Sequence, residues 1–242
     1  MNLPPSILEV LQTFTRHRLQ ALLMGGQACI AYGGAEFSRD IDFAILATTQ
    51  NLTALEAALS ELRADVIAVP PLSLEALHAG LAVHFRCRAP GVDGLRIDVM
   101  SHMRGVADFP DLWSRRTELP GGFGILSLPD LVQAKKTQRD KDWPMIRRLL
   151  EADYIRHPQP DPAQLAFWLR ECRTPEILLS LTAAHPATAA EQSRPAVQAA
   201  LALATAEHLT SLLHEEEMAE RTADIAYWTP RKKQLEALRR HS

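Results

Sequence analysis

The sequence has few cysteines, no long apolar run and little net charge, and each of these shortages excludes a class of protein. Its three cysteines stand far apart among 242 residues, which argues against both a disulfide framework and a zinc cluster. No stretch approaches the roughly 18 apolar residues that span a bilayer, and no basic segment followed by an apolar one opens the chain. The formal net charge of −3 excludes a surface that is basic throughout. We therefore expect a cytoplasmic protein without a signal peptide or membrane segment.

The chain has two consecutive parts that differ in their sequence pattern. Up to about residue 156, short apolar runs alternate with amphipathic stretches, which predicts strands and helices together. The segment His157–Pro162 contains three prolines in six residues and is typical of a linker. After it the chain is rich in Ala, Leu and Glu and has no strand-like run. The sequence therefore predicts an α/β domain over 1–156 and a helical domain over 157–242.

Turn residues and apolar periodicity place the individual elements within these two parts. Ser6 and Glu9 have the spacing of a capping box, which predicts the start of the first helix. Further helices are expected over 27–32, 52–62, 162–172, 174–183, 195–220 and 230–240. Strands are expected over 21–24, 41–46, 66–69, 81–87, 95–100 and 125–128.

Two acids, Asp40 and Asp42, stand two residues apart on the strand expected over 41–46. Side chains alternate along a strand, so both carboxylates lie on one face while Ile41 and Phe43 lie on the other. Two like charges this close repel each other, and a divalent cation between them removes that repulsion. Mg²⁺ prefers oxygen ligands and keeps coordination positions for substrate phosphates. An isolated pair of this kind is more often a solvated strand end than a metal site.

A third acid, Asp98, lies on the strand expected over 95–100. Alternation places Arg96, Asp98 and Met100 on one face of that strand. If this strand pairs with the one that carries Asp40 and Asp42, all three carboxylates face one site, and three carboxylates can hold two metal ions.

A pair of glycines, Gly25 and Gly26, separates an expected strand from an expected helix. Exposed backbone N–H groups at the positive end of a helix form a phosphate-binding site. A Gly-Gly pair alone is weak evidence, and this chain has two others. This pair supports a phosphate-binding site because an Asp-x-Asp strand follows it.

These motifs, in this order, resemble the DNA polymerase β-like nucleotidyltransferase superfamily. Within it they resemble the AbiEii-like nucleotidyltransferases, some of which are toxins of type IV toxin–antitoxin systems. The likeness rests on Gly25-Gly26, on Ser38-Arg-Asp-Ile-Asp-Phe43, on Asp98 and on the stretch from Leu126 to Asp142. It implies an α+β fold, with a mixed sheet flanked by helices and an all-helical C-terminal region.

The resemblance also implies a reaction. Two Mg²⁺ ions would bind Asp40, Asp42 and Asp98, and a nucleotide would pass from an NTP such as ATP to an acceptor hydroxyl, releasing pyrophosphate. The implied acceptor is RNA, with tRNA the first choice, and a cognate antitoxin-like protein is an implied partner. Many family members have Ser where this chain has Gln27, whose amide can still donate to a phosphate. The residues implied in nucleotide binding are Gly25, Gly26, Gln27, Ser38, Arg39 and Lys135.

Lys135 is also singled out by its position in the apolar pattern. It continues the stripe of Leu128 and Leu131 at helical spacing, so its side chain must either reach solvent or meet an anion. Two basic clusters, over 135–148 and 231–240, are candidate RNA contacts or solvated helix faces.

Three other functions stay open at this point. The acceptor could be a small molecule of the antibiotic type. The chain could instead be a non-catalytic NTP-binding or protein-interaction module on the same fold, which the departure at Gln27 permits. It could also be the structural partner of another chain, with the C-terminal helices as the interface.

Overall fold

The computed structural model describes residues 3–240, and these divide into two compact units. Unit 1 contains residues 3–31, 36–134 and 227–240, and unit 2 contains residues 32–35 and 135–226. The boundary expected at 156/157 therefore falls inside unit 2. Whether 1–156 and 157–242 are separate folding domains stays a prediction. No helix of the described chain is both long and apolar enough to cross a bilayer.

Unit 1 is built on a seven-stranded sheet with the order β3-β4-β5-β2-β1-β7-β6. β2 pairs with β5 and β1 pairs with β7 in parallel, whereas the other neighbours pair antiparallel. The expected mixed sheet is therefore confirmed. The strands are β1 (Ala21–Met24), β2 (Asp40–Ile45), β3 (Asp65–Val66), β4 (Val83–Arg86), β5 (Arg96–Met100), β6 (Thr117–Glu118) and β7 (Gly124–Ile125).

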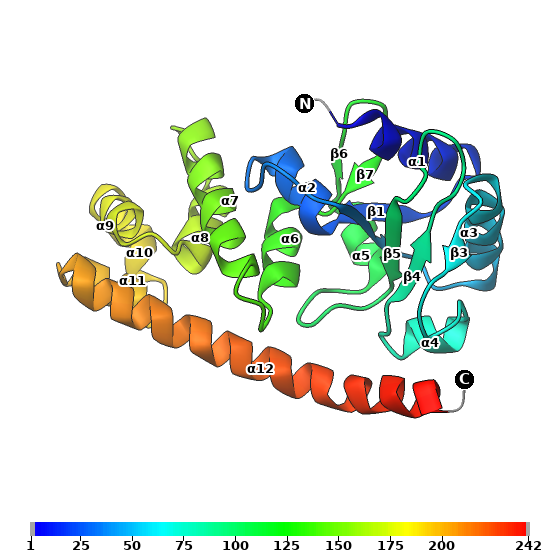
Figure 1. Ribbon diagram of the computed structural model, residues 1–242. Coiled ribbons are helices and arrows are strands. Elements are labelled where there is room, and N and C mark those ends of the chain that lie inside the picture. Colours follow the sequence, from blue (N-terminus) through cyan, green and yellow to red (C-terminus); the bar gives the residue numbers. More distant parts are fainter. Residues whose placement is uncertain (1–2, 241–242) are drawn as a thin grey trace. The chain divides into compact units, whose positions relative to one another are not determined.

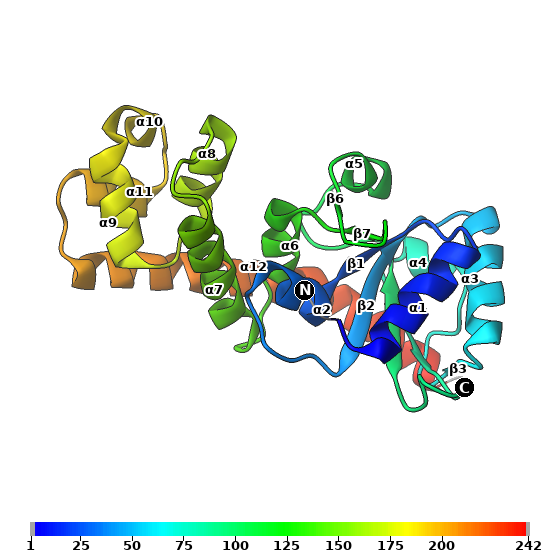
Figure 2. The same cartoon turned by 90° about the horizontal axis from the view of Figure 1, so that it is seen from above.

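Helices flank this sheet, and two of them, α1 and α3, lie side by side over one of its faces (Figures 1 and 2). Phe14 of α1 contacts Phe43 of β2, with ring centroids 4.6 Å apart. Ile41 and Phe43 are fully buried on this face, as alternation along the strand predicts. The helices here are α1 (Pro5–Arg16), α2 (Gly25–Tyr32), α3 (Thr49–Glu61), α4 (Leu74–His78), α5 (Phe109–Ser114) and α6 (Leu128–Lys135).

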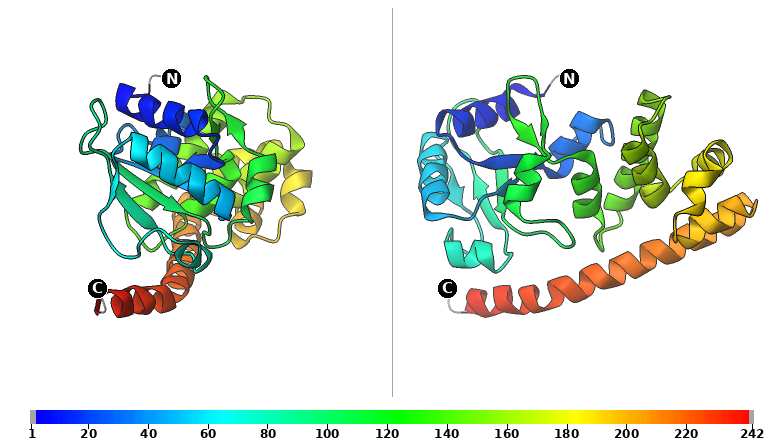
Figure 3. Two further views of the ribbon diagram at one scale, coloured as in Figure 1. Left: turned by 90° about the vertical axis from the view of Figure 1, so that its right-hand side faces the viewer. Right: turned by 180° about the vertical axis from the view of Figure 1, so that it is seen from behind.

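Unit 2 is helical, which confirms the all-helical C-terminal region. Its centre includes Trp168, whose indole Nε1 donates to Asp153 at 2.8 Å. α9, α10 and α11 group beside the first part of α12 (Figure 3). The helices are α7 (Asp142–Arg156), α8 (Pro162–Glu171), α9 (Pro175–Ala184), α10 (Pro186–Ala190), α11 (Pro195–Leu201) and α12 (Ala206–Arg240), whose residues from 227 onward belong to unit 1.

Several expected elements differ from those observed. The single helix expected over 195–220 is wrong, because α11 ends before Leu203, which has a positive φ of 59°, and α12 begins three residues later. The separate helix expected from Pro230 is also wrong, because α12 continues through that proline. The capping role of Ser6 is wrong too: the helix begins at Pro5, whose ring presets the helical φ. The strands expected over 66–69 and 125–128 are shorter, at 65–66 and 124–125.

Asn51 of α3 holds together the end of the β1–β2 pair. Its Oδ1 accepts from the Gln20 N–H at 2.8 Å, and its Nδ2 donates to the carbonyls of Gln20 and Leu46 at 3.0 and 2.8 Å. Gln20 directly precedes β1 and Leu46 directly follows β2. One buried amide therefore holds together one end of this strand pair, and toward the other end β1 leads into Gly25 of α2 while β2 carries Asp42.

Replacing Asn51 with Ala should lower the free energy of unfolding by about 1–3 kcal/mol, because buried backbone groups of Gln20 and Leu46 lose their partner. Urea unfolding followed by circular dichroism measures this. Thr53→Ala on the same helix is the control, since its hydroxyl bonds only to its own helix and its loss should cost within about 0.5 kcal/mol. If the two variants were equally stable, the role of Asn51 in holding β1 and β2 together would be wrong.

Candidate active site

One row of residues crosses the middle of the sheet and contains two of the three acids. Asp42 of β2 lies opposite Asp98 of β5 in the parallel pairing, and opposite Met24 of β1 in the antiparallel pairing. On the other side of Asp98 lies His84 of β4. Residues in register point to the same face, so Asp42, Asp98 and His84 share the face opposite Phe43. The strand pairing that the third-acid hypothesis required is therefore present.

A second row lies two residues back along β2 and β5. Asp40 is opposite Arg96, which in turn is opposite Arg86 of β4. The sheet face thus presents three carboxylates together with two arginines and one histidine. Asp40 and Asp42 are both half-buried, at an edge between core and solvent.

Asp98 is held by two neighbours on this face. Arg96 donates from Nε to Oδ1 at 2.8 Å and from Nη2 to Oδ2 at 2.9 Å, a bidentate pair. His84 Nδ1 lies 2.8 Å from Oδ1 of Asp98 and 3.0 Å from Nη2 of Arg96, so its tautomer decides which contact is a hydrogen bond. Burial raises the pKa of Asp98, but the bonds from His84 and Arg96 outweigh burial and leave that pKa below its usual range.

The charges of the other two acids also act on Arg96. Its pKa is raised first by the hydrogen bonds to Asp98, and further by the charges of Asp40 and Asp42. A guanidinium cation therefore neutralises part of the negative charge that the three carboxylates concentrate on this face.

Each glycine of the pair meets a predicted site residue. A Cβ on Gly25, which has a positive φ of 65°, would collide with the Asp42 carboxylate, and one on Gly26 would collide with the Ser38 hydroxyl. Only glycines allow these two side chains to approach the start of α2 so closely. The Asp42 carboxylate therefore lies directly against the N-terminus of α2.

Ser38 and Gln27 fasten the segment that leads into β2. The Ser38 hydroxyl donates to the Asp40 carbonyl at 3.1 Å, and Gln27 Nε2 donates to the Ser38 carbonyl at 3.1 Å. Gln27 is 1% exposed, and within the described residues no donor reaches its Oε1. In this arrangement the amide of Gln27 holds the loop. Its predicted bond to a phosphate stays a prediction.

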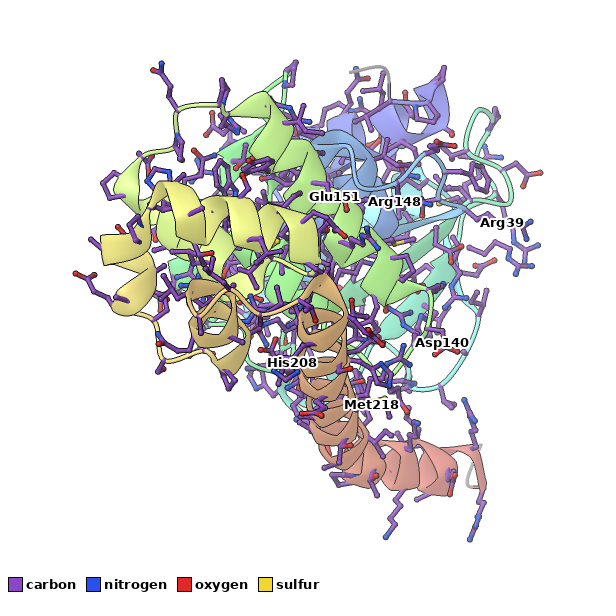
Figure 4. All side chains as sticks on the ribbon, turned by 90° about the vertical axis from the view of Figure 1, so that its left-hand side faces the viewer. Arg39, Asp140, Arg148, Glu151, His208 and Met218 are labelled. Carbon is purple, nitrogen blue, oxygen red and sulfur yellow. The ribbon has the colours of Figure 1, made fainter. Side chains whose placement is uncertain are left out.

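Two further predicted site residues are Arg39 and Lys135. Arg39 is exposed, and its side chain points away from the fold (Figure 4). Lys135 opens the long segment of unit 2 and is 7% exposed, with its Nζ 3.1 Å from Oδ1 of Asp142. Of the two outcomes that the apolar stripe allowed, reaching solvent or meeting an anion, the structure shows the second, with this internal carboxylate as the anion. The phosphate roles of Arg39 and Lys135 stay predictions.

Carboxylate oxygens on this face fit Mg²⁺ in chemical type and in their order on the sheet. They are not gathered into a ligand set, however: nowhere in residues 3–240 do three His, Cys, Asp or Glu side chains form a group that could hold a metal ion. The reason lies at Asp98, where Arg96 binds both oxygens. Asp40 and Asp42 could hold a metal as ligands on one strand, and Asp98 could join them only by releasing Arg96.

Comparisons with known proteins add little to this geometry. No family model matches the sequence, and no curated protein matches it. A crystal structure of an H. pylori protein with a provisional nucleotidyltransferase name is similar, at 11% identity and a TM-score of 0.44, over 92% of this chain and 94% of that chain. The AbiEii-like resemblance stays a prediction, and the functional hypothesis rests on the arrangement of the site itself.

Arg96 and His84 are the site residues that sequence reasoning missed. Alternation placed Arg96 on the same face as Asp98, so part of the signal was present. His84 was not among the candidate site residues. The missing information was the register between β4 and β5, which places His84 directly opposite Asp98.

Asp142 gives a pH test of the charge network around Lys135. Burial raises the pKa of Asp142, but the charges of Lys135 and Arg139 outweigh burial and lower that pKa overall. A lowered folded-state pKa stabilises the fold above the unfolded pKa, and this stabilisation is lost as the pH falls through the folded pKa. Asp142→Asn should cost about 3–5 kcal/mol at neutral pH, because it leaves a buried ammonium unpaired.

The cost of Asp142→Asn should shrink as the pH falls below about 3.9, the usual carboxyl pKa. Urea unfolding of wild type and variant between neutral and acidic pH measures this difference. Asp140→Asn is the control, since that side chain is 97% exposed and its surface pair should contribute about 0–1 kcal/mol. A cost for Asp142→Asn that stayed constant across this range would contradict the lowered pKa.

Proposed function

We propose that this protein is a nucleotidyltransferase that moves a nucleotide from an NTP to an acceptor hydroxyl and releases pyrophosphate. One observation supports this above the others: the Asp42 carboxylate lies both against Gly25 at the start of α2 and opposite Asp98 on β5. The proposed phosphate site and the proposed cation site thus meet at one point of the sheet.

The triphosphate would bind at the start of α2. N–H groups in the first turn of a helix lack partners within it and carry partial positive charge. Gly25 and Gly26 leave these groups uncovered by side chains, so phosphate oxygens can approach the backbone. The Ser38 hydroxyl, which lies against Gly26, would turn from the Asp40 carbonyl to donate to the same phosphates.

Asp40 and Asp42 would hold Mg²⁺, which when bound would neutralise phosphate charge and lower the pKa of the attacking hydroxyl. Asp98, once released from Arg96, would accept the proton of that hydroxyl. His84 would orient Asp98 through its contact with Oδ1. The guanidinium of Arg96, when freed, would lie beside the developing negative charge of the leaving group.

RNA is the acceptor class we propose first, with tRNA as the specific case and an antitoxin-like protein as regulator. The basic cluster over 135–148 supports this less than its composition suggests, because four of its cations are bound internally, by Asp142, Glu171 and Glu151. The cluster over 231–240 is mostly exposed and is the better RNA contact. Steep weakening of binding with salt would indicate RNA, whereas a small-molecule acceptor would show little salt dependence.

A second candidate function is a non-catalytic NTP-binding module. The observation that favours it is the bidentate Arg96–Asp98 pair, which keeps the third acid engaged. Such a module would bind NTP without transferring it, and it would do so whether or not Arg96 were present.

Asp42→Asn should reduce nucleotide transfer on the order of 100-fold or more, because it removes a charge at the reacting phosphates while preserving side-chain shape. Each α-labelled NTP would be incubated with Mg²⁺ and total RNA or a small-molecule extract, and the labelled product resolved. Asp93→Asn, at an exposed turn, is the matched control and should transfer like wild type. Full activity of Asp42→Asn would disprove the assignment of the site.

Arg96→Gln should strengthen Mg²⁺ or Mn²⁺ binding by about tenfold or more, because the cation no longer displaces a charge-assisted pair at Asp98. Calorimetric titration of the metal measures this without any turnover. Arg86→Gln, the arginine one strand further along the same face, is the control and should bind metal like wild type. Metal binding that Asp42→Asn does not weaken would refute the metal site itself. Equal affinity in wild type and Arg96→Gln would refute only the competition.

A further inference from the structure

Unit 2 contains a cavity of about 460 Å³ that the proposed reaction does not use. Trp143 and Arg147 of α7, Arg173 and Pro175 at the start of α9, and His214 and Arg221 of α12 line it. Figure 4 views the molecule from the side of these helices, with Asp140 of the lining labelled. A cavity of this volume is in the range that holds small ligands.

Arg173 is the unusual group in this lining. Its side chain is 9% exposed and packs over Trp143, with the guanidinium carbon 5.3 Å from the ring centroid. Nη1 donates to Glu216 at 3.0 Å, but Nε is buried and, within residues 3–240, has no hydrogen-bond partner. A buried N–H donor without a partner has lost its bonds to water without replacing them, so the hydrogen bonding of this site is incomplete.

The carboxylate that Arg173 binds is shared. Its partner Glu216 also binds Arg194, which reaches the same carboxylate at 2.7 Å. Burial lowers the pKa of Arg173 and the positive charge of Arg194 lowers it further, whereas the charges of Glu216, Glu171 and Glu220 raise it. Two guanidinium groups thus share one directly bonded carboxylate, and the other two acids act on Arg173 only through their charges.

The other arginines and acids of the lining have partners of their own. Its two acids, Asp140 and Glu217, both bind Arg221, at 2.6 and 2.7 Å. Arg147 is bound to Glu151 at 2.8 Å, and its side chain is 53% exposed. Arg173 is therefore the arginine of the lining whose bonded carboxylate is shared with a second arginine.

The start of α9 adds a second source of positive potential. α9 has ten residues and begins at Pro175, which lines the cavity next to Arg173. The N–H groups of its first turn lack partners within the helix and carry the positive end of the helix dipole, which Glu176, an acid of that turn outside the lining, offsets in part. Guanidinium groups and helix N-termini are both recurrent partners of phosphate.

We propose that this cavity binds the phosphate group of a nucleotide or of an RNA chain end, through Arg173 and the N-terminus of α9. A phosphate has enough oxygens to accept from the Arg173 guanidinium, from the α9 backbone and from His214 at once, whereas a carboxylate has two. Trp143 is 5% exposed and has Arg173 and Arg221 over its ring, so it offers no free face to a base. Binding is therefore independent of base identity, and it is independent of the proposed transfer site.

Calorimetry in EDTA, which removes any contribution from a metal site, tests this with three probes: inorganic phosphate, the four nucleoside monophosphates, and a 5′-phosphorylated RNA trinucleotide. Arg173→Gln should weaken binding of each probe that binds by at least about tenfold, because it removes the buried charge that the phosphate neutralises. Arg170→Gln is the control, since that arginine is 58% exposed and outside the lining.

A second variant keeps the test valid if Arg173→Gln does not fold. Thr210 lines the cavity from the exposed side of α12, so Thr210→Trp should block the cavity without changing its charge. Thr222→Trp is its matched control, because Thr222 lies on the same helix outside the lining and makes the same bond to the carbonyl four residues back.

The outcomes separate clearly. Phosphate binding that either lining variant weakens, and that neither control weakens, supports the cavity as the site. Tighter binding of monophosphates than of the trinucleotide indicates a free nucleotide, and the reverse indicates an RNA end. No binding of any probe by wild type, wild-type affinity in a folded lining variant, or a clear preference for one base would overturn the proposal.

Discussion

The parallel pairing of β2 with β5 is the constraint on which the candidate site depends. It places Asp42 opposite Asp98 across the only parallel contact that β2 makes in the described sheet. A shift of one residue in that register would turn Asp98 to the buried face, where Ile97 and Val99 pack with no exposed surface. The buried apolar residues of β2 and β5 therefore fix which residues lie on the polar face, because a shift in register would bury a carboxylate in the core.

Charge balance is the second condition on this face. Three carboxylates within two rows of a sheet repel one another, and the fold offsets this repulsion with Arg96, which donates to Asp98 from Nε and Nη2. This arginine stabilises the three acids when no divalent cation is bound, and in the proposed site it would compete with that cation for Asp98. On that proposal, stability of the unliganded protein and assembly of a three-acid metal site would be opposed through one side chain.

Unit 2 uses its charges differently. Lys135 and Lys136 are both buried and bind Asp142 and Glu171, so cations that look like an exposed basic cluster in the sequence form internal pairs. Pairs of this kind are costly to break because the remaining partner is a buried charge. Arg173 departs from this pattern, because its one carboxylate is shared and its Nε has no partner in the described chain.

The sequence by itself determined the local features: the mixed and helical halves, the glycine pair at the start of α2, and the alternation that separates Asp40 and Asp42 from Phe43. These follow from periodicity and turn chemistry over a few residues, which short-range sterics control. Predictions from the sequence were wrong where a helix continues through a proline, at Pro230, and where a residue other than glycine has a positive φ, at Leu203.

Only the tertiary structure decided which distant residues meet. Strand register brought His84 to Asp98, and helix packing brought Glu171 to Lys136. Both depend on contacts between segments far apart in the chain, whose free energies come from burying apolar faces that no local pattern specifies. The residue types needed for phosphoryl chemistry were therefore visible in the sequence, whereas the partners that hold or compete for them were not.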